Sequence, residues 1–321
     1  MTTVHRGVDD CPRPPRGAAV TIGSYDGVHR GHQTVINALR RAASDRGLAT
    51  AVVTFDRHPA TVVRPESAPL LLTELEQEIE LLAATGVDHV LVLTFDEARS
   101  KEPAEDFVHE MLVGCLNARL VLVGDDFHFG HQRRGNVDLL RRMGADLGFD
   151  VVGVKLVDIE GAPAGDQASR VSSTAIRQAL TAGDLEHANH LLGRPHEVRG
   201  IVEHGDHRAR EWGFPTANVA VPDRIQLPAD GIYAAWFRRA DGSVHPGAAS
   251  LGRRPTFYED QPFRLLEVHL LDGLDYDLYG ERVAVRFVER LRDEVKFDSV
   301  DALVDRIRHD CDDARRVLAP H

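Results

Sequence analysis

The sequence has few of the features that mark secreted, cysteine-metal or membrane proteins. Its three cysteines, Cys11, Cys115 and Cys311, lie far apart and form no CxxC pair, so we expect neither a disulfide framework nor a cysteine-based zinc site. The longest apolar runs, such as Val90 to Leu93, are much too short to cross a membrane. The first residues lack the apolar core of a signal peptide. These absences predict a cytoplasmic protein with no membrane partner.

The sequence also has fewer positively charged than negatively charged residues. The chain has 38 Lys and Arg against 50 Asp and Glu, which gives a formal net charge of −12. A general nucleic-acid binder needs a basic face, so we expect no nucleic-acid partner. Nucleotide substrates remain compatible, because a few local cations and a bound Mg²⁺ can hold a triphosphate inside an acidic protein. With 321 residues, two domains are expected, and a homo-oligomer is compatible with the sequence.

Up to about Leu192, short apolar strands alternate with helical patterns. The strand candidates are Ala18–Ile22, Ala51–Phe55, His89–Phe95, Leu120–Val123 and Val151–Val154. Apolar residues recur at helical spacing between them, in three groups: Val35, Ile36, Leu39 and Ala43; Leu75, Ile79 and Leu82; Phe107, Met111 and Cys115. Thr73 followed by Glu76 predicts a capping box for the second helix. Residues 18–192 therefore read as an α/β domain with a parallel sheet covered on both faces.

The pattern changes after Gly193, where shorter β-rich segments are separated by turn residues. These segments are Val198–Glu203, Gly231–Phe237, Ala248–Leu251, Leu265–Leu271 and Val283–Val288. A last helix is marked by an apolar stripe of Val300, Leu303, Ile307, Cys311 and Leu318. Residues 193–321 are therefore predicted to form a small antiparallel barrel or sandwich with a C-terminal helix. Residues 1–17 contain several prolines and are expected to be a loose extension.

The clearest motif is the segment from Val20 to Gln33, in which a strand leads through a glycine-bearing turn to His29-Arg30-Gly31-His32 and a helix. Glycine lets the backbone approach phosphate oxygens, and the start of a helix offers free N–H groups. His29 and His32 can donate hydrogen bonds to a phosphorus centre that gains charge during reaction. The alternative is that both are loop and cap histidines with no ligand.

This motif resembles the HxGH signature of the nucleotidyltransferase superfamily. Three further runs, Thr54–Pro59, Gly124–Asn136 and Val171–Leu180, are similar to the FAD-synthesising module of bacterial bifunctional riboflavin kinase/FAD synthetases. The resemblance implies a Rossmann-like domain that uses ATP and FMN as substrates. Its expected nucleotide- and flavin-binding residues are Gly23, Asp26, Gly31, Asp126, Phe127, Phe129, Gly130, Ser172 and Thr174.

For two groups of these residues, a role can also be predicted from the chemistry of the side chains alone. Ser172, Ser173 and Thr174 with Arg177 place hydroxyls and a guanidinium at a helix start, which suits the β- and γ-phosphates of ATP, although an ordinary N-cap explains them as well. Phe127 and Phe129 are suited to flank a planar isoalloxazine, and packing into the core is an equal alternative.

Some residues depart from the family pattern near the expected flavin and adenine pockets. The family commonly has Phe at the position of Tyr25, Arg at that of His128 and Asp at that of Asn136, and Glu-Pro-His-Pro at Asp56–Pro59. These departures leave the phosphate motifs intact and raise the alternative of a modified flavin or another phosphorylated acceptor.

In the second part, GFPTANV at residues 213–219 carries oxygen ligands suited to magnesium. Thr216 offers a hydroxyl and Asn218 a carbonyl oxygen for Mg²⁺ that bridges nucleotide phosphates. Glu267 lies between Leu266 and Val268, so its carboxylate either faces solvent by simple alternation or serves as a base toward a bound hydroxyl.

PTAN, Leu251–Phe257, EVHLLD and residues 278–299 follow the riboflavin kinase module in the same order. The resemblance implies that Thr216 and Asn218 hold Mg²⁺–ATP, that Glu267 activates the 5′-hydroxyl of riboflavin, and that the loop residues Gly213, Phe214 and Pro215 contact ligand. Where the family usually has Gly, this chain has Ala209, and an Ala forced to positive φ would cost about 1 kcal/mol. We therefore expect a slower or altered kinase.

The predicted function is bifunctional: riboflavin is phosphorylated to FMN, and FMN is adenylylated to FAD with release of pyrophosphate. His29, His32, Ser173 and Arg177 would position ATP and stabilise charge in the second reaction. Two alternatives stay open, namely a paralogue with one active domain or another acceptor, and a non-catalytic flavin or nucleotide sensor on the same folds.

Overall fold

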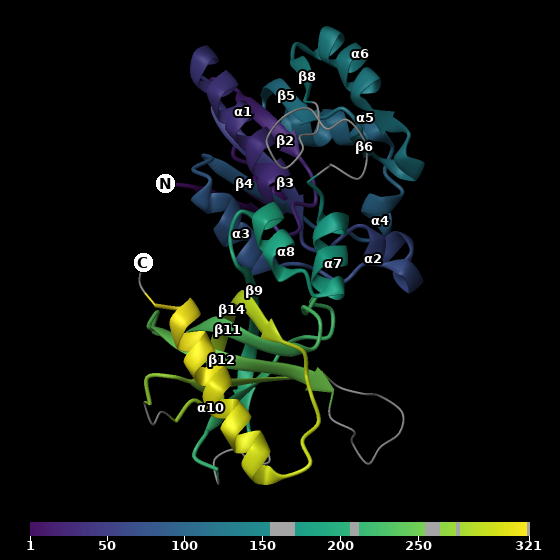
Figure 1. Ribbon diagram of the computed structural model, residues 1–321. Helices are drawn as coiled ribbons and strands as arrows, with labels where there is room; N and C mark the ends of the chain where they lie inside the picture. Colours follow the sequence, from purple (N-terminus) through teal and green to yellow (C-terminus); the bar gives the residue numbers. More distant parts are fainter. Residues whose placement is uncertain (155–170, 206–211, 254–263, 274–276, 320–321) are drawn as a thin grey trace. The chain divides into compact units, whose positions relative to one another are not determined.

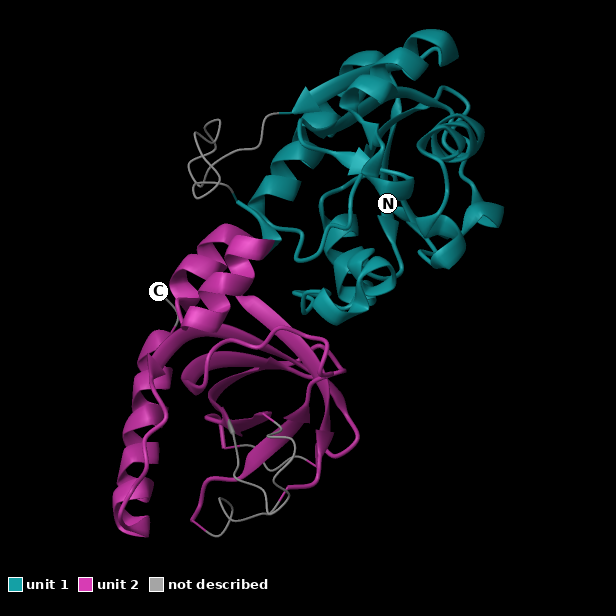
Figure 2. Ribbon diagram, turned by 90° about the vertical axis from the view of Figure 1, so that its right-hand side faces the viewer, with its two compact units in different colours: residues 1–173 teal, residues 174–321 magenta. Residues whose placement is uncertain are grey.

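The computed structural model describes residues 1–154, 171–205, 212–253, 264–273 and 277–319 (Figure 1). By its internal contacts the chain divides into two compact units, residues 1–173 and 174–321, which are coloured separately in Figure 2. The first unit is an α/β domain and the second is a β-barrel with helices. Ala209 and residues 254–257 of the LGRRPTF motif lie outside the described residues.

Unit 1 is built on a six-stranded sheet in which every pairing is parallel. The strand order is β1-β4-β3-β2-β5-β8, and the strands are β1 Thr3–Arg6, β2 Ala18–Ile22, β3 Ala49–Phe55, β4 His89–Leu93, β5 Ala118–Gly124 and β8 Asp150–Val154. β2 and β4 are almost wholly buried, because neighbouring residues point to opposite faces and both faces are covered. The predicted parallel α/β sheet is confirmed.

The helices of unit 1 form a layer on each face of the sheet. α1 (Arg30–Arg46) and α3 (Leu75–Ala84) pack on the face that carries Val52 and Val90. The opposite face is covered by α5 (Ala104–Phe107), which continues as the π-helix η3 (Val108–Cys115), and by α6 (Val137–Leu147). The shorter elements are η1 Val8–Asp10, α2 Ala60–Val63, η2 Pro65–Ser67, α4 Glu97–Ser100, β6 His128–Phe129, η4 His131–Arg133 and β7 Gly135–Asn136.

The N-terminal segment is more ordered than its prolines suggest. Thr3–Arg6 forms the edge strand β1 beside β4, so the expectation of a loose extension is wrong for this part. Cys11 and Cys115 form a disulfide, which corrects the expectation that no cysteines pair. The amide of Asn117 donates to the carbonyl of Pro14 beside this link. Spacing along the chain cannot reveal such a pair, because the fold brings together segments that are 104 residues apart.

Unit 2 contains a closed six-stranded antiparallel barrel. Its strand order is β10-β13-β12-β11-β14-β9, and the strands are β9 His196–Glu203, β10 Thr216–Ala220, β11 Gly231–Arg238, β12 Val244–Arg253, β13 Arg264–Leu270 and β14 Arg282–Arg292. The inward residues alternate with outward ones, and Tyr233, Phe237 and Phe287 fill the interior. The predicted barrel is confirmed, with β10 as a strand that the periodicity did not reveal.

Within the described residues, three helices belong with the barrel. α10 (Val300–Val317) buries Cys311 and Ala314 against the outer surface of β11 and β12, and Ser299 caps its first turn. α7 (Ser173–Ala182) and α8 (Leu185–Leu192) also lie largely in unit 2, where α8 contacts β9 and β14. The division by contacts therefore falls before the predicted boundary at 192/193, which stays a prediction.

The Cys11–Cys115 link gives a test of the fold. Closing a long loop removes conformations from the unfolded chain, so reduction of the oxidised protein is expected to lower its free energy of unfolding by about 2–4 kcal/mol. Urea unfolding with and without a reductant measures this change. The Cys11→Ser variant is the control and should be insensitive to the reductant. Equal stability of the oxidised and reduced wild type would contradict the pairing.

Candidate active sites

The HxGH segment lies where β2 ends and α1 begins, at the carboxyl edge of the parallel sheet. His29 is the N-cap of α1, and its Nδ1 accepts a hydrogen bond from the backbone N–H of His32 at 3.3 Å. The rings of His29 and His32 stack with centroids 3.6 Å apart. A Cβ at Gly31 would lie 3.1 Å from the Val171 carbonyl oxygen and 3.2 Å from the His29 ring. A larger residue would require these neighbours to shift by a few tenths of an ångström.

The cap also fixes which nitrogen of His29 carries the proton. Because Nδ1 accepts from a backbone amide, a neutral His29 must carry its proton on Nε2. The Nε2–H group is then a hydrogen-bond donor at the start of α1. Paired donors at a helix N-terminus are suited to binding and stabilising negative charge.

Asp26 holds the loop that leads into this motif. Its buried Oδ1 accepts hydrogen bonds from the backbone N–H of Leu72 at 2.8 Å and of Thr73 at 3.1 Å. The Thr73 hydroxyl accepts from the N–H of Gly27, and the Ser173 hydroxyl donates to the Asp26 carbonyl at 2.9 Å. Thr73 therefore does not cap α3, whose N-cap is Glu74, and the predicted capping box is wrong.

The same loop contains two strained residues. Tyr25 and Val28 have φ values of 43° and 38°, which a non-glycine residue, and above all a β-branched one, adopts only when the surroundings enforce it. Tyr25 is buried against α3 and its hydroxyl is hydrogen-bonded to Thr21 Oγ1 at 2.8 Å. Burial raises the pKa of the Tyr25 phenol. The hydroxyl of Tyr25, which stands where the family commonly has Phe, thus has a hydrogen-bond partner within the core.

A second buried acid, Glu78 of α3, lies behind this loop and was not found from the sequence. Thr54, at the end of β3, donates a hydrogen bond to its Oε1 at 2.6 Å. Burial raises the pKa of Glu78 to about 8, and the nearby Asp26 carboxylate adds to the rise. Two buried carboxylates in one region repel each other, so Glu78 is held as the neutral acid at neutral pH.

The candidate flavin residues of unit 1 surround the β6–β7 ribbon. The Phe127 and Phe129 rings stack with centroids 5.4 Å apart and pack, half-buried, on the core beside Phe107. Gly130 has φ 68°, and a Cβ there would lie 2.7 Å from Ala104, whereas Asp126 is exposed. Core packing of both rings is therefore present, and flavin contact stays a prediction.

Two departures from the family pattern have local structural roles. Asn136 caps α6, with its Oδ1 accepting from the N–H of Leu139 at 2.9 Å, a role for which Asn and Asp are equally good. His128 is exposed and its Nδ1–H donates to the Asp126 carbonyl. Neither residue disturbs the fold around it.

The residues of the SSTAIR run fall at the division between the units. Ser173 begins α7 and is bonded to Asp26 within unit 1, with half-buried Ser172 before it. Gly23 lies against the Tyr25 ring in the same unit. Thr174 is exposed and Arg177 lies one turn further along α7, both assigned to unit 2 by contacts. The structure thus joins Ser173 to the loop that leads into the HxGH motif.

In unit 2, strand pairing brings the three predicted kinase residues together. β10 and β13 are antiparallel, with Asn218 directly opposite Glu267 and Thr216 opposite His269. Directly opposed side chains share one face of a sheet. Leu266 and Val268 are buried in the barrel, so Glu267 lies on the outer surface with Thr216 and Asn218.

Asn218 carries an oxygen that the described part of the chain leaves unsatisfied. The residue is 9% exposed, and among the described residues its Oδ1 has no hydrogen-bond partner. Its amide nitrogen packs on Gly205, where a Cβ would lie 2.2 Å from Nδ2. Leaving a buried acceptor unpaired costs free energy, so such an atom is a candidate ligand for a cation.

His269 and Ser250 lie directly opposite two of the predicted kinase residues in the barrel. His269 donates through Nδ1–H to the Pro215 carbonyl at 2.8 Å and contacts the Phe214 ring edge-on, and burial lowers the pKa of His269. Gly213 has φ 86° and a Cβ there would meet nothing within 4 Å. Sequence reasoning missed Ser250, which lies opposite Glu267 on β12, since only the strand register reveals it.

Glu78 gives a pH-dependent prediction. Its pKa is higher in the folded than in the unfolded chain, so the stability it contributes is complete below about pH 4.5 and is lost as the pH rises through about 8. Glu78→Gln is therefore expected to match the wild type at about pH 5 and to be a few kcal/mol more stable at about pH 9. Denaturant unfolding at both pH values measures this, and parallel curves for the two proteins would contradict it.

Comparison with known proteins assigns a family to each of the two parts of the chain. The family model for FAD synthetase matches residues 11–174, and the model for riboflavin kinase matches residues 192–318. Proteins named bifunctional riboflavin kinase/FMN adenylyltransferase are similar over nearly the whole length: one from Pseudomonas fluorescens is 41% identical, with 98% of this chain and 97% of that protein covered. One from Escherichia coli K12 is 37% identical, with 95% and 94% covered.

A solved structure also has this architecture. A Streptococcus pneumoniae protein described as a macrolide-efflux protein has a TM-score of 0.83 and 31% identity, with 98% of this chain and 99% of that chain covered. No helix within the described ranges of the present chain is long and apolar enough to span a membrane. Two family models and the full-length relatives thus agree, and the chain belongs to the family of bifunctional riboflavin kinase/FMN adenylyltransferases.

Proposed function

We propose that unit 2 phosphorylates riboflavin to FMN with ATP and that the HxGH region of unit 1 adenylylates FMN to FAD. The observation that carries the proposal is the pairing of Asn218 with Glu267 across β10 and β13. It places an unsatisfied oxygen and a carboxylate side by side in the module that matches riboflavin kinase. Both reactions are phosphorus transfers, in which the protein mainly positions reactants and stabilises charge.

In the adenylyl transfer, a phosphate oxygen of FMN attacks the α-phosphorus of ATP, and pyrophosphate leaves. Nε2–H of His29 would donate to an oxygen that gains charge, and the positive end of the α1 dipole would favour the negative charge there. His32 stacks on His29 and keeps its ring in place. Ser173 fixes the loop through Asp26, and Arg177 is proposed to bind the leaving phosphates.

Phe127, Phe129, Gly130 and Asp126 are proposed to border the flavin of this reaction. Gly23 and Gly31 have no side chain and would let the backbone approach the nucleotide. A Cβ at either position would also lie within 3.2 Å of a neighbouring ring of the protein. Ser172 and Thr174 would add hydroxyl donors at the start of α7. Asp26 acts by holding the loop, since its Oδ1 accepts two backbone hydrogen bonds.

In the kinase reaction, the ribityl 5′-hydroxyl of riboflavin attacks the γ-phosphorus of ATP, and ADP leaves. The carboxylate of Glu267 would accept the hydroxyl proton. Gly213, Phe214 and Pro215 lead directly into Thr216 and are proposed to contact the nucleotide. The slower kinase expected from Ala209 stays a prediction, because that residue lies outside the described part.

Magnesium fits the oxygen atoms on this surface. The buried Oδ1 of Asn218 and the hydroxyl of Thr216 are hard ligands of the kind Mg²⁺ prefers. No cluster of three or more His, Cys, Asp or Glu in the described residues could hold a metal, which suits an ion bound mainly by water and substrate phosphates. Bound Mg²⁺ would neutralise phosphate charge. We place the enzyme in the cytoplasm, a reducing environment in which a disulfide such as Cys11–Cys115 is uncommon.

His29 can be tested separately for capping and for catalysis. Asn is a good N-cap, so His29→Asn should keep the stability of α1, whereas His29→Ala should lose about 1 kcal/mol. Both variants should form FAD from FMN about a hundredfold more slowly, because each lacks the Nε2–H donor. FMN formation by the same chain is the internal control. An unchanged rate in His29→Asn would show that His29 is only a cap.

Glu267 can be tested with an exposed carboxylate of β14 as its match. Glu267→Gln should slow FMN formation from riboflavin at least about a hundredfold and leave FAD formation from supplied FMN unchanged. Glu289→Gln should alter neither reaction, since Glu289 is exposed on β14, which does not pair with β13. Chromatographic product analysis gives both rates. Full kinase activity of Glu267→Gln would remove Glu267 from the role of base.

A further inference from the structure

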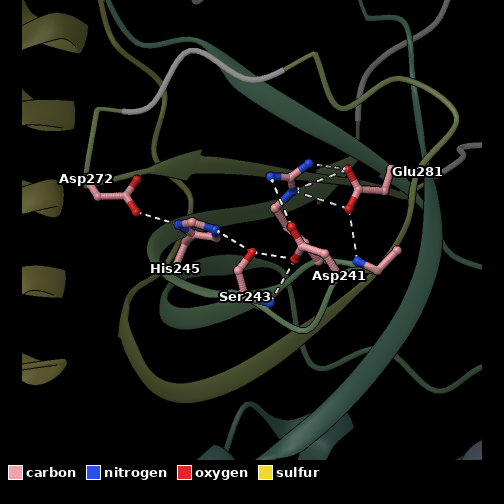
Figure 3. Close-up of polar contacts among 7 residues, drawn as sticks. Asp241, Ser243, His245, Asp272 and Glu281 are labelled. Carbon is pink, nitrogen blue, oxygen red and sulfur yellow. Dashed lines mark hydrogen bonds and ion pairs between the residues drawn. The ribbon is translucent and has the colours of Figure 1, made fainter.

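A chain of polar contacts joins the β11–β12 turn to the two segments that flank residues 274–276. On β12, His245 donates from Nδ1–H to Asp272 Oδ2 at 2.5 Å, and its Nε2 lies 3.0 Å from Ser243 Oγ. The Ser243 hydroxyl and N–H both contact Asp241 Oδ1, at 2.7 and 2.8 Å. Figure 3 shows these side chains in line between Asp272 and the turn.

The order Asp–His–Ser is that of a hydrolytic triad, but the surroundings do not support a nucleophile. The Ser243 hydroxyl has a single proton, and Asp241 is a nearer acceptor for it than His245. The backbone N–H of Ser243, which could otherwise help to stabilise an oxyanion, already donates to Asp241. The chain of contacts is therefore better suited to hold the turn in one position.

The other end of the turn holds Glu281. The Arg239 guanidinium donates to Glu281 Oε2 at 3.0 Å, and the N–H of Ala240 donates to Oε1 at 2.9 Å (Figure 3). Arg239 and Glu281 are both mostly buried, with side chains 18% and 16% exposed. A charge-assisted pair shielded from water in this way restrains both backbones more than a surface pair would.

Glu281 in turn fixes the end of β9. The N–H of Val202 donates to the Glu281 carbonyl at 3.0 Å, and the N–H of Gly280 donates to the Val202 carbonyl at 2.8 Å. Next to them, the Tyr279 ring stacks on His204 with centroids 3.7 Å apart. Gly205 follows and lies in contact with the Asn218 amide. The position of Asn218 thus depends on contacts that begin at His245 and Glu281.

We propose that Glu281 and His245 are positioning residues of the kinase, which hold the β9 end against Asn218 so that its Oδ1 faces the bound nucleotide. The proposal rests on the proposed function of unit 2. Neither residue touches substrate in this account. Glu281 acts directly on β9, and His245 acts one step earlier by fixing the turn that holds Glu281.

The test measures the KM for Mg²⁺–ATP and the kcat of FMN formation by the full chain. Because Asn218 would contact the nucleotide equally in the ground and transition states, Glu281→Ala should raise KM roughly tenfold and leave kcat nearly unchanged. His245→Phe should raise KM about threefold, and the double variant should be no worse than Glu281→Ala, because both act through the same turn. Glu281→Gln, which keeps an acceptor for Ala240, should recover part of the loss and serves if Glu281→Ala does not fold.

Two controls separate the possible outcomes. Asp305→Ala, which breaks an exposed pair with Arg308 on α10, should leave both constants unchanged, and FAD formation from FMN should be unchanged in every variant. Unaltered KM in Glu281→Ala and Glu281→Gln, or a fall in kcat alone, would overturn the positioning role while leaving the kinase assignment intact. A wild-type chain that forms no FMN would instead contradict the proposed function.

Discussion

The first site depends on one buried carboxylate. Asp26 binds the backbone at Leu72 and Thr73, and its own carbonyl accepts the Ser173 hydroxyl, so three distant parts of the sequence meet at one residue. The same loop holds Tyr25 and Val28 at positive φ, which residues other than glycine adopt only when their surroundings impose it. The loop places the stacked imidazoles of His29 and His32 at the N-terminus of α1, where the helix backbone favours anions.

The second site is organised by a different constraint. There the hydrogen-bonded register of β10 and β13 sets Asn218 beside Glu267. A shift of one residue in that pairing would turn one of the two side chains into the barrel. Closure of the barrel fixes this register, because every strand has two neighbours. The two candidate sites thus depend on a strained loop in one unit and on strand pairing in the other.

Much of this was predictable where the signal is local. The alternation of strand and helix patterns predicted the α/β sheet, and Gly31 with its two flanking histidines predicted where the first candidate site lies. The contribution of Asp26 and Thr73 was not predictable, because their bonds join segments far apart in sequence, and a good capping pattern at Thr73 concealed them. The Cys11–Cys115 link and Glu78 were missed for the same reason: burial and pairing across the fold leave no periodic trace.

If one chain catalyses both reactions, FAD made from riboflavin must contain phosphorus from two different positions of ATP. Riboflavin is incubated with the protein, Mg²⁺ and ATP labelled at either the γ- or the α-phosphorus, and the FAD formed is isolated. The account predicts that FAD takes up the γ-label through its FMN phosphate and the α-label through its AMP moiety, in equal amounts. FAD that carries the α-label without the γ-label, or no labelled FAD at all, would contradict the presence of two working sites.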